Sequence, residues 1–197
     1  MYWPFALPAE MARSADSWLR GSLDALGISY RLDTWQHLAD HGPPDLDPES
    51  VDLLFVGGGN TFGLLDQVRR HGFIEPVRRF WRAGGDYYGG SAGAVLACES
   101  IEIAAGLDPN EPGLKDLAAL GLLSGAAVLP HFTDEQLAEA GRWAAQHSTV
   151  VLGLPDSIGL RCGAGRATVV GAGHLSRVSP ETVERFAPGD VLDLDVG

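Results

Sequence analysis

The apolar run from Val51 to Val56 constrains the fold more than any other segment of the chain. Only Asp52 interrupts it, and a run this apolar is typical of a strand that is buried on both faces of a parallel sheet. The run ends at the glycines Gly57-Gly58-Gly59, after which Phe62 to Arg70 has the pattern of a helix. The segment therefore predicts a strand–turn–helix unit of the kind that builds parallel sheets.

The rest of the chain repeats this alternation. Helices are expected over Ala9–Leu26, Phe73–Ala83, Ala92–Cys98 and Glu135–Gln146. Strands are expected over Tyr2–Ala6, Ile28–Leu32, Ala126–Leu129, Thr149–Leu152, Leu160–Cys162, Ala167–Val170 and Val191–Leu194. The pattern predicts an α/β fold, a mainly parallel sheet flanked by helices, formed by a single domain over residues 1–197.

The composition excludes several classes of partner. The formal net charge of −12 would repel the phosphates of nucleic acids and anionic membrane surfaces, so neither is expected as a partner. No apolar stretch approaches the ~20 residues that a membrane span needs. Residues 1–8 lack the basic start and the long apolar core of a signal peptide. We therefore expect a cytoplasmic protein.

The cysteines and histidines give no sign of a metal site. Cys98 and Cys162 are far apart in the chain, and two buried thiols in a reducing cytosol are expected, with a single disulfide as the alternative. Four histidines lack ligand spacing with one another or with the cysteines: His37, His41, His71 and His147. The sequence therefore predicts neither a metal nor a cofactor.

Ser91 lies in a second strand-to-helix turn. The segment from Gly89 to Gly93 matches the pattern Gly-x-Ser-x-Gly, in which a sharp bend exposes the serine hydroxyl and the next N–H groups point at the atom it attacks. Small residues around a serine also mark ordinary tight turns. The motif by itself therefore does not identify a nucleophile.

Four groups follow directly after expected strands: Gly57–Thr61, Ser91, His131 and Asp156. In open parallel sheets, ligands bind outside the carboxyl ends of the strands. Each group alone has a plain interpretation as a turn or a solvated loop residue. Together they would bring a hydroxyl, an imidazole, a carboxylate and N–H donors to one edge of the sheet, which is what nucleophilic hydrolysis needs.

Four segments in this order resemble the aspartyl dipeptidase (peptidase E) family of serine peptidases, to which the cyanophycinases are more distantly related. They are Phe55–Phe62, Gly90–Ala94, Leu129–Phe132 and Gly153–Asp156, and the resemblance extends from about Tyr2 to Gly173. It implies a fold similar to that of class I glutamine amidotransferases, and a Ser-His-Glu triad.

Carried over residue by residue, the resemblance makes Ser91 the nucleophile and His131 the general base, with Asp156 where the family has its glutamate. The oxyanion-binding region matches Gly58, Gly59 and Ala92. The resemblance also implies that Asn60 and Thr61 line the pocket; capping of the following helix is the alternative, and both can hold.

The order of acid and base separates the chain from the α/β-hydrolases, which share the pattern Gly-x-Ser-x-Gly. In those enzymes the acid precedes the histidine, whereas here His131 precedes Asp156. The one histidine after Asp156, His174, lies in a glycine-rich C-terminal segment. The order therefore favours the amidotransferase-like arrangement.

The resemblance implies a serine exopeptidase or dipeptidase that cleaves a short peptide after its N-terminal residue. Aspartate is the expected residue at that position, and the reaction passes through an acyl-enzyme. Two alternatives stay open: a catalytically silent member of the fold that binds a small molecule or a peptide, and an amidase that acts on a non-peptide substrate.

Three further expectations concern the surroundings of the site. The family has a β-strand before the segment that matches Tyr2–Pro8. Either the start codon is misassigned, or the sheet lacks this strand and pairs its exposed edge with another subunit, as in a homodimer. Arg161 and Arg166 are candidates for binding an aspartyl side chain, with solvated surface positions as the alternative. Three acids after the serine helix either face the substrate or are solvated: Asp108, Glu111 and Asp116.

Overall fold

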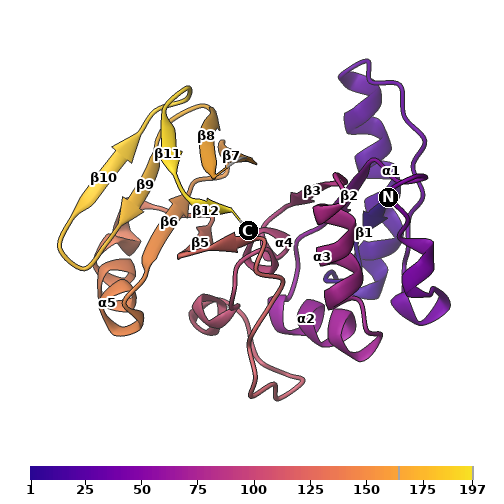
Figure 1. The fold of residues 1–197 in the computed structure, drawn as a ribbon, viewed down its shortest axis with the longest axis horizontal. Helices are drawn as coiled ribbons and strands as arrows, with labels where there is room; N and C mark the ends of the chain where they lie inside the picture. The colour runs from indigo at the N-terminus through magenta and orange to yellow at the C-terminus, as the bar shows by residue number, and fades with distance from the viewer. Residues whose placement is uncertain (164, 197) are drawn as a thin grey trace. The chain divides into compact units, whose positions relative to one another are not determined.

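The computed structural model describes residues 1–163 and 165–196, and these divide into two compact units (Figure 1). Unit 1 comprises Met1–Leu96 and Asp108–Lys115, and unit 2 comprises Ala97–Leu107 and Asp116–Gly197. The chain therefore leaves unit 1, returns to it for the short segment 108–115 and leaves it again. A single domain over residues 1–197 stays a prediction.

Unit 1 is a parallel three-stranded sheet with helices after each strand. The strands have the order β1-β2-β3, and they are β1 (Tyr2–Trp3), β2 (Leu53–Val56) and β3 (Asp86–Gly89). The helices are α1 (Ala9–Ala25), α2 (Thr61–Arg70), α3 (Ile74–Arg82) and α4 (Ala92–Leu96), with the 3₁₀ turns η1 (Leu38–Asp40) and η2 (Pro43–Asp45). The predicted strand–turn–helix unit is thus confirmed at β2 and α2.

The strands of unit 1 end level with one another. Trp3 pairs with Val56, and Val56 pairs with Gly89. The loops that leave β2 and β3, at Gly57 and Gly90, therefore start side by side. This register brings the two glycine-rich turns of the sequence together.

Apolar side chains fill the interior of unit 1. Leu54 and Val56, which share one face of β2, are fully buried. The opposite face is only partly covered, since Leu53 is 41% exposed and Phe55 is half-buried, so the predicted burial on both faces is confirmed for one face only. Trp3 packs against Trp35 and Phe73, with ring centroids 6.0 and 5.5 Å away. This aromatic packing anchors the short strand β1 to the rest of the unit.

Unit 2 has one parallel strand pair and otherwise antiparallel strands. Its largest sheet has the order β10-β9-β6-β5, in which β5 and β6 are parallel; the sheets β11-β8-β7 and β12-β4 are antiparallel. The strands are β4 (Leu123–Ser124), β5 (Ala126–Pro130), β6 (Val150–Leu154), β7 (Ile158–Gly163), β8 (Arg166–Gly171), β9 (Leu175–Val178), β10 (Val183–Phe186), β11 (Val191–Asp193) and β12 (Asp195–Val196). The helical segments are η3 (Glu102–Gly106), η4 (Asp134–Gln136) and α5 (Leu137–His147).

Parallel strands flanked by helices confirm the predicted α/β class (Figure 1). The sequence predicts no strand over β9 and β10, since the adjacent charged residues Glu184 and Arg185 break the alternation of polar and apolar residues. These strands form because β9 pairs with the edge of β6 that β5 does not occupy, and β10 then pairs with β9. In the part of the chain that the structure describes, no helix has both the length and the apolarity to cross a membrane.

The strand expected over Ile28–Leu32 is wrong, because this segment is irregular. The edge strand β1 has only two residues, and the single bridge formed beside it joins Tyr2 to Thr34. The two-residue strand β1 is too short to pair with a strand of five residues at this edge of the sheet.

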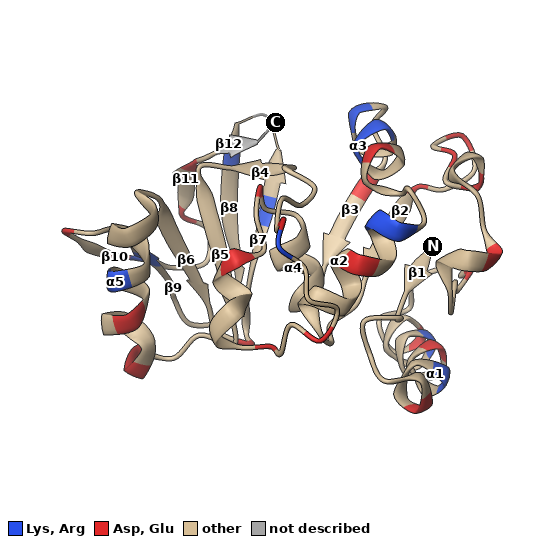
Figure 2. Ribbon diagram, turned by 90° about the horizontal axis from the view of Figure 1, so that it is seen from below, with Lys and Arg blue, Asp and Glu red and all other residues tan. Residues whose placement is uncertain are grey.

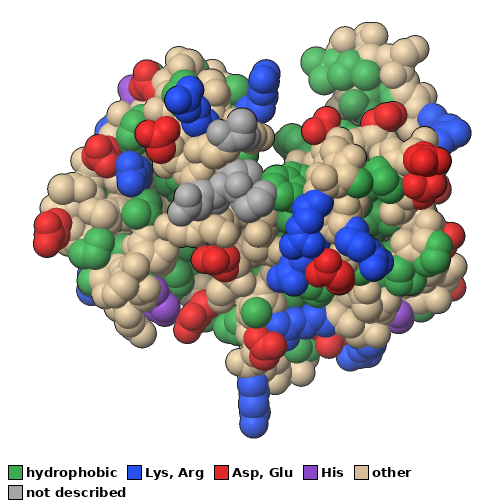
Figure 3. Space-filling view, viewed as in Figure 1, with side chains coloured by type: hydrophobic (Ala, Val, Ile, Leu, Met, Phe, Trp, Pro, Cys, Tyr) green, Lys and Arg blue, Asp and Glu red, His purple; other side chains and the backbone are tan. Residues whose placement is uncertain are grey.

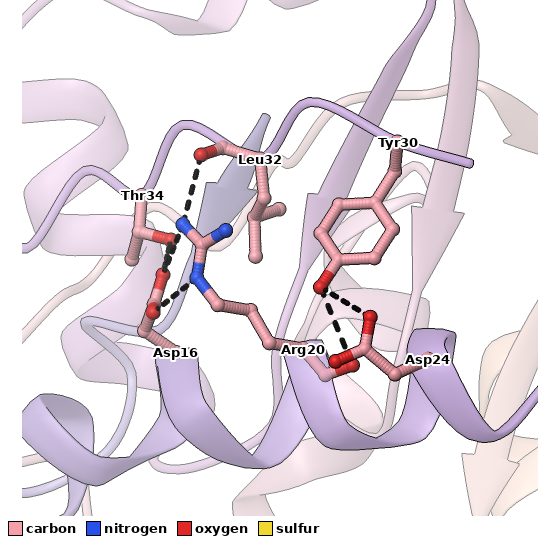
Figure 4. Close-up of polar contacts among 6 residues, drawn as sticks. All are labelled: Asp16, Arg20, Asp24, Tyr30, Leu32 and Thr34. Atoms are coloured by element: carbon pink, nitrogen blue, oxygen red, sulfur yellow. Dashed lines mark hydrogen bonds and ion pairs between the residues drawn. The ribbon is translucent and has the colours of Figure 1, made fainter. Parts of the chain in front are cut away.

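Side chains of α1 hold this segment instead (Figure 4). Arg20 donates Nε to Asp16 Oδ2 at 2.7 Å and Nη2 to the carbonyl of Leu32 at 3.0 Å. The Tyr30 hydroxyl donates to the Asp24 carboxylate at 3.0 Å. The segment therefore lies along the helix through polar contacts rather than through a strand ladder.

Segment 108–115 supplies part of the cap of α2. Oδ2 of Asp108 accepts hydrogen bonds from the backbone N–H of Thr61 at 2.8 Å and from its hydroxyl at 2.6 Å. Asn60 donates its Nδ2 to the carbonyl of Pro109 at 3.0 Å. A carboxylate at a helix N-terminus satisfies an otherwise unpaired N–H and interacts favourably with the helix dipole. Asp108 is therefore an anchor of the returning segment and not a solvated loop acid.

The two cysteines differ in their surroundings. Neither forms a disulfide, and Cys98 is buried while Cys162 is exposed, so the expectation of two buried thiols is wrong for Cys162. Burial raises the pKa of the Cys98 thiol to about 12. Neighbouring groups cover enough of the Cys162 sulfur to raise the pKa of that thiol as well. Cys162 pairs with Ala167 near the turn end of the β7–β8 hairpin, where Arg161 and Gly163 are exposed as well.

This difference predicts that a maleimide adds to one thiol per folded chain, at Cys162, slowly at neutral pH and faster as the pH rises, because the thiolate is the reactive form. Mass spectrometry of the labelled protein counts the adducts. Cys162→Ser should give none in the folded protein and one after denaturation. Rapid labelling of Cys98 without denaturant would contradict the burial of that side chain.

The cap predicts that Asp108→Ala lowers the free energy of unfolding of unit 1 by about 1–3 kcal/mol, the range for hydrogen bonds to a charged group. Urea unfolding followed by circular dichroism measures the change. Glu111→Ala is the matched control, since Glu111 is exposed on the same segment and should shift stability by less than about 0.5 kcal/mol. Equal midpoints for the two variants would show that the cap does not stabilise the unit.

Candidate active site

Ser91 occupies the turn between β3 and α4 in a left-handed backbone conformation, with φ at 50°. The carbonyl of Ser91 accepts hydrogen bonds from the N–H groups of Ala94 at 2.9 Å and Val95 at 3.2 Å, so it starts the first turn of α4. Residues other than glycine rarely adopt a positive φ, and those that do concentrate at functional sites. The backbone therefore presents Ser91 as the strained residue of a nucleophile elbow.

The glycines of the motif follow from close backbone contacts. A Cβ on Gly93 would lie 2.2 Å from the carbonyl oxygen of Val56, and a Cβ on Gly89 would lie 2.5 Å from the carbonyl oxygen of Gly93. The hydroxyl of Tyr87 donates to that same Gly93 carbonyl at 2.7 Å. Only glycine at both positions lets α4 pack directly on β2 and close the turn around Ser91.

The glycine loop after β2 lies against the serine. A Cβ on Gly58 would stand 3.0 Å from Cβ of Ser91 and 3.6 Å from its Oγ. Gly59 has φ at 136°, and a Cβ there would overlap the carbonyl of Ala6. Within residues 1–163 and 165–196, the N–H groups of Gly58, Gly59 and Ala92 donate no hydrogen bond. The three predicted oxyanion donors are thus available to a ligand.

Asn60 and Thr61 fix the end of this loop. Oδ1 of Asn60 accepts a hydrogen bond from the N–H of Gly63 at 2.7 Å, which confirms the helix-capping interpretation. Thr61 is buried, and its hydroxyl donates to Asp108. The pocket role of these two side chains stays a prediction, because neither belongs to the cavity at Ser91.

A cavity of about 490 Å³ opens at Ser91 within unit 1. Gly57, Gly58 and Gly90 form its wall next to the serine, and the remaining wall is mostly apolar. A reactive group at the wall of a concave, largely apolar pocket is the usual arrangement of a small-molecule site.

In unit 2, His131 and Asp156 form a hydrogen-bonded pair. Nδ1 of His131 lies 2.6 Å from Oδ1 of Asp156. Both side chains are exposed, the imidazole by 63% and the carboxylate by 80%. A carboxylate on Nδ1 fixes the imidazole tautomer in which Nε2 carries the lone pair and can act as a proton acceptor.

The two residues meet because β5 and β6 end together. Pro130 pairs with Leu154 in parallel register, and the N–H of Phe132 donates to the Leu154 carbonyl at 3.1 Å. Phe132 is buried, and its ring lies where a Cβ on Gly153 would stand. His131 projects from this anchored turn with φ at 57°.

Left-handed backbone marks the candidate residues in both units. Among the described residues, three that are not glycine have positive φ: Ser91, His131 and Ser148. Ser148 is explained by its place at the C-cap of α5. Ser91 and His131 end no helix, so their strain belongs to the turns that follow β3 and β5.

The structure thus groups the sequence-predicted residues in two sets. Ser91 lies with the glycine loop in unit 1, and His131 lies with Asp156 in unit 2. The sequence reasoning missed the aromatic wall of the cavity, which a search for polar catalytic residues does not detect. Among the described residues, no group of three or more His, Cys, Asp or Glu side chains could hold a metal ion.

Comparisons with known proteins agree with these motifs. The sequence model of peptidase family S51 matches residues 31–170, which include both glycine turns, His131 and Asp156. Curated proteins named peptidase E, from Escherichia coli O1:K1 / APEC and Shigella boydii serotype 18, are 30% identical to the chain over 161 residues. The alignment covers 76% of this chain and 65% of each relative, so the chain spans just under two thirds of the length of these relatives.

Two solved structures have the same fold. A protein from Listeria monocytogenes EGD-e assigned to peptidase E superposes with a TM-score of 0.64 at 20% identity, covering 95% of this chain and 85% of that one. A peptidase from an acI-B1 actinobacterium superposes with a TM-score of 0.71 at 19% identity, covering 98% and 82%. They confirm the predicted class I glutamine amidotransferase-like fold. The family match over most of the sequence goes further than the fold: this chain belongs to peptidase family S51.

Proposed function

We propose that the chain is a serine-type peptidase that hydrolyses short peptides. Ser91 is the nucleophile, His131 the general base and Asp156 the group that orients the imidazole. The observation that carries this proposal is the left-handed Ser91 at the wall of a cavity, with Gly58 packed against it. Membership of family S51 supports the same reaction class.

The chemistry follows from what each group can do. Serine is a poor nucleophile until an imidazole accepts its proton, so Nε2 of His131 takes the Ser91 proton as Oγ attacks the scissile carbonyl. The N–H groups of Gly58 or Gly59 and of Ala92 then hold the negative oxygen of the tetrahedral intermediate. Each such donor is typically worth about 10²–10³ in rate. His131 next gives the proton to the leaving amine, and water hydrolyses the acyl-enzyme.

The hydrogen bond between His131 and Asp156 supports the aspartate in the position where the family resemblance implies a glutamate. Asp156 is one methylene shorter than glutamate, and at 2.6 Å its carboxylate is within full hydrogen-bond distance of Nδ1. The loop after β6 therefore compensates for the shorter side chain. On this basis the triad is Ser-His-Asp.

The resemblance further implies cleavage after an N-terminal aspartate in a cytoplasmic enzyme. Of the two candidate basic residues, Arg161 is exposed on β7, and Arg166 is exposed with its Nε 3.8 Å from Asp193. Neither arginine belongs to the cavity at Ser91. The specificity therefore needs a direct test, with aspartyl dipeptides compared with other dipeptides.

The proposed role of Ser91 predicts that Ser91→Ala abolishes dipeptide hydrolysis, lowering kcat/KM by at least about 10³-fold because nothing replaces the attacking oxygen. A fluorophosphonate should add once to the folded wild-type protein, at Ser91, and not to this variant. Hydrolysis is followed by release of free amino acid, and the adduct is located by peptide mass spectrometry.

Ser148→Ala is the matched control, since Ser148 has the same left-handed backbone, φ at 51°, at a helix end. It should retain both hydrolysis and labelling. Wild-type turnover in Ser91→Ala would reject the mechanism. Folded wild-type protein that takes no label and hydrolyses nothing would favour a silent binding protein, and labelled protein without dipeptide turnover would favour an amidase.

The hydrogen-bonded pair in unit 2 predicts that Asp156→Asn lowers kcat by about 10²–10⁴-fold with little change in KM, because the amide no longer stabilises the imidazolium. Asp134→Asn is the control. Asp134 lies in η4, three residues after His131, and pairs with Arg185 at 2.9 Å rather than with His131. Steady-state kinetics on one dipeptide measure both variants. Equal kcat values for Asp156→Asn and the wild type would remove Asp156 from the triad.

A further inference from the structure

The cavity at Ser91 has a helical wall with an exposed apolar stripe. Four residues of α1 line it at helical spacing: Met11, Ser14, Ala15 and Trp18. Met11 is 56% exposed and Trp18 is 62% exposed. Residues three and four apart lie on one face of a helix, so this face of α1 is turned toward the cavity.

Aromatic rings form the opposite wall. The ring of Phe55 lies between those of Tyr2 and Tyr88, with centroids 5.0 and 4.5 Å away. These residues come from β1, β2 and β3, and the cavity continues from them to Gly90 and Ser91. Pockets that bind whole small-molecule ligands have volumes of about 300–1,000 Å³. The cavity volume of about 490 Å³ therefore leaves room for a benzyl or isobutyl group beside the nucleophile.

The cavity contains no basic side chain. Among the described residues, those that line it are apolar, glycine, serine or tyrosine. Figure 2 shows no Lys or Arg on β1, β2 or β3, and the sequences of these strands contain none. A carboxylate entering the cavity would therefore lose its hydration without gaining an ion pair.

α1 has two arginines, Arg13 and Arg20, and neither lines the cavity. Arg13 is exposed and directly precedes Ser14 in the sequence, whereas Arg20 is engaged in an ion pair. Arg20 is bound to Asp16 and to the carbonyl of Leu32, on the face of α1 that holds segment 28–34 (Figure 4). Neither Arg20 nor Asp16 lines the cavity. The pair therefore contributes no positive charge that could bind an acidic substrate.

The raised pKa of Tyr2, which lines the cavity, agrees with an apolar environment. Burial raises the pKa of this cavity residue, and the negative charge of Asp16 raises that pKa further. Both effects disfavour an anion, whether it is a tyrosinate or the carboxylate of a bound side chain. This raised pKa thus agrees with an apolar cavity wall.

We infer that the cavity at Ser91 is the specificity pocket of the enzyme and binds a large apolar side chain, aromatic or branched aliphatic, of the residue whose carbonyl Ser91 attacks. That residue is joined to Ser91 in the acyl-enzyme, so its side chain lies within reach of the cavity wall. The inference rests on the proposed function. On this inference, the enzyme prefers substrates whose N-terminal residue is leucine or phenylalanine over substrates with an N-terminal aspartate.

The test compares the dipeptides Phe-Ala, Leu-Ala, Asp-Ala and Gly-Ala as substrates of the wild-type enzyme. A hydrophobic pocket discriminates by about tenfold or more for a missing large apolar group, so kcat/KM for Phe-Ala or Leu-Ala should exceed that for Asp-Ala and Gly-Ala by at least that factor. Asp-Ala as the best substrate, or equal values for all four, would overturn the inference.

Variants of the wall locate the preference in the cavity. Met11→Arg should lower the ratio of Phe-Ala to Asp-Ala turnover by about tenfold or more, since it brings a positive charge to an exposed wall position. Leu26→Arg is the matched control. Leu26 is 72% exposed, beyond the end of the same helix and outside the cavity. Figure 3 shows that hydrophobic side chains also reach the surface elsewhere on this face of the molecule. The inference is overturned if the two variants change the ratio equally.

Binding measurements separate this inference from the proposed reaction. Calorimetry on the Ser91→Ala variant should give at least about tenfold tighter binding of Phe-Ala than of Asp-Ala, whether or not the wild type hydrolyses either. No hydrolysis by the wild type together with this preference would reject the peptidase and keep the pocket. A dimer that Met11→Arg dissociates and Leu26→Arg does not would overturn the pocket, because a second copy would then cover it.

Discussion

The contact between Gly93 of α4 and the carbonyl of Val56 in β2 is the constraint on which the candidate site depends. That carbonyl accepts a hydrogen bond from the N–H of Gly90 at 2.9 Å, and a Cβ on Gly93 would lie 2.2 Å from its oxygen. One backbone atom of β2 therefore fixes the chain on both sides of Ser91. The turn between these two points is so short that the left-handed conformation of Ser91 closes it.

Unit 2 holds His131, the proposed base, in a similar way. Two parallel strands end in register at Pro130 and Leu154, and a backbone hydrogen bond from Phe132 to Leu154 closes the turn that contains His131. The buried Phe132 ring occupies the space left by Gly153, so this turn cannot shift along the sheet. In both units the chemistry-bearing residue is held by backbone strain and packing, which preorganises it before a ligand binds.

The sequence predicts the parts of the molecule that local patterns determine. The apolar run Val51–Val56 predicts a strand, and the glycines flanking Ser91 predict a tight turn from strand to helix; the structure confirms both elements. The strand expected over Ile28–Leu32 fails because strand formation depends on a partner edge, which a single segment does not reveal. The capping role of Asp108 and the exposure of Cys162 likewise depend on contacts between distant segments. The aromatic wall was missed because its rings come from three strands.

The two units would contribute different terms to the rate of the proposed reaction. The His131–Asp156 pair moves a proton whatever the substrate side chain is, so it acts on the chemical step for all substrates equally. The cavity in unit 1, as the inferred pocket, would contact the side chain without moving a proton, so it would act on the difference between substrates. Substrate preference can therefore change by substitutions on α1, at positions such as Met11 and Trp18, while the strained turn at Ser91 stays the same.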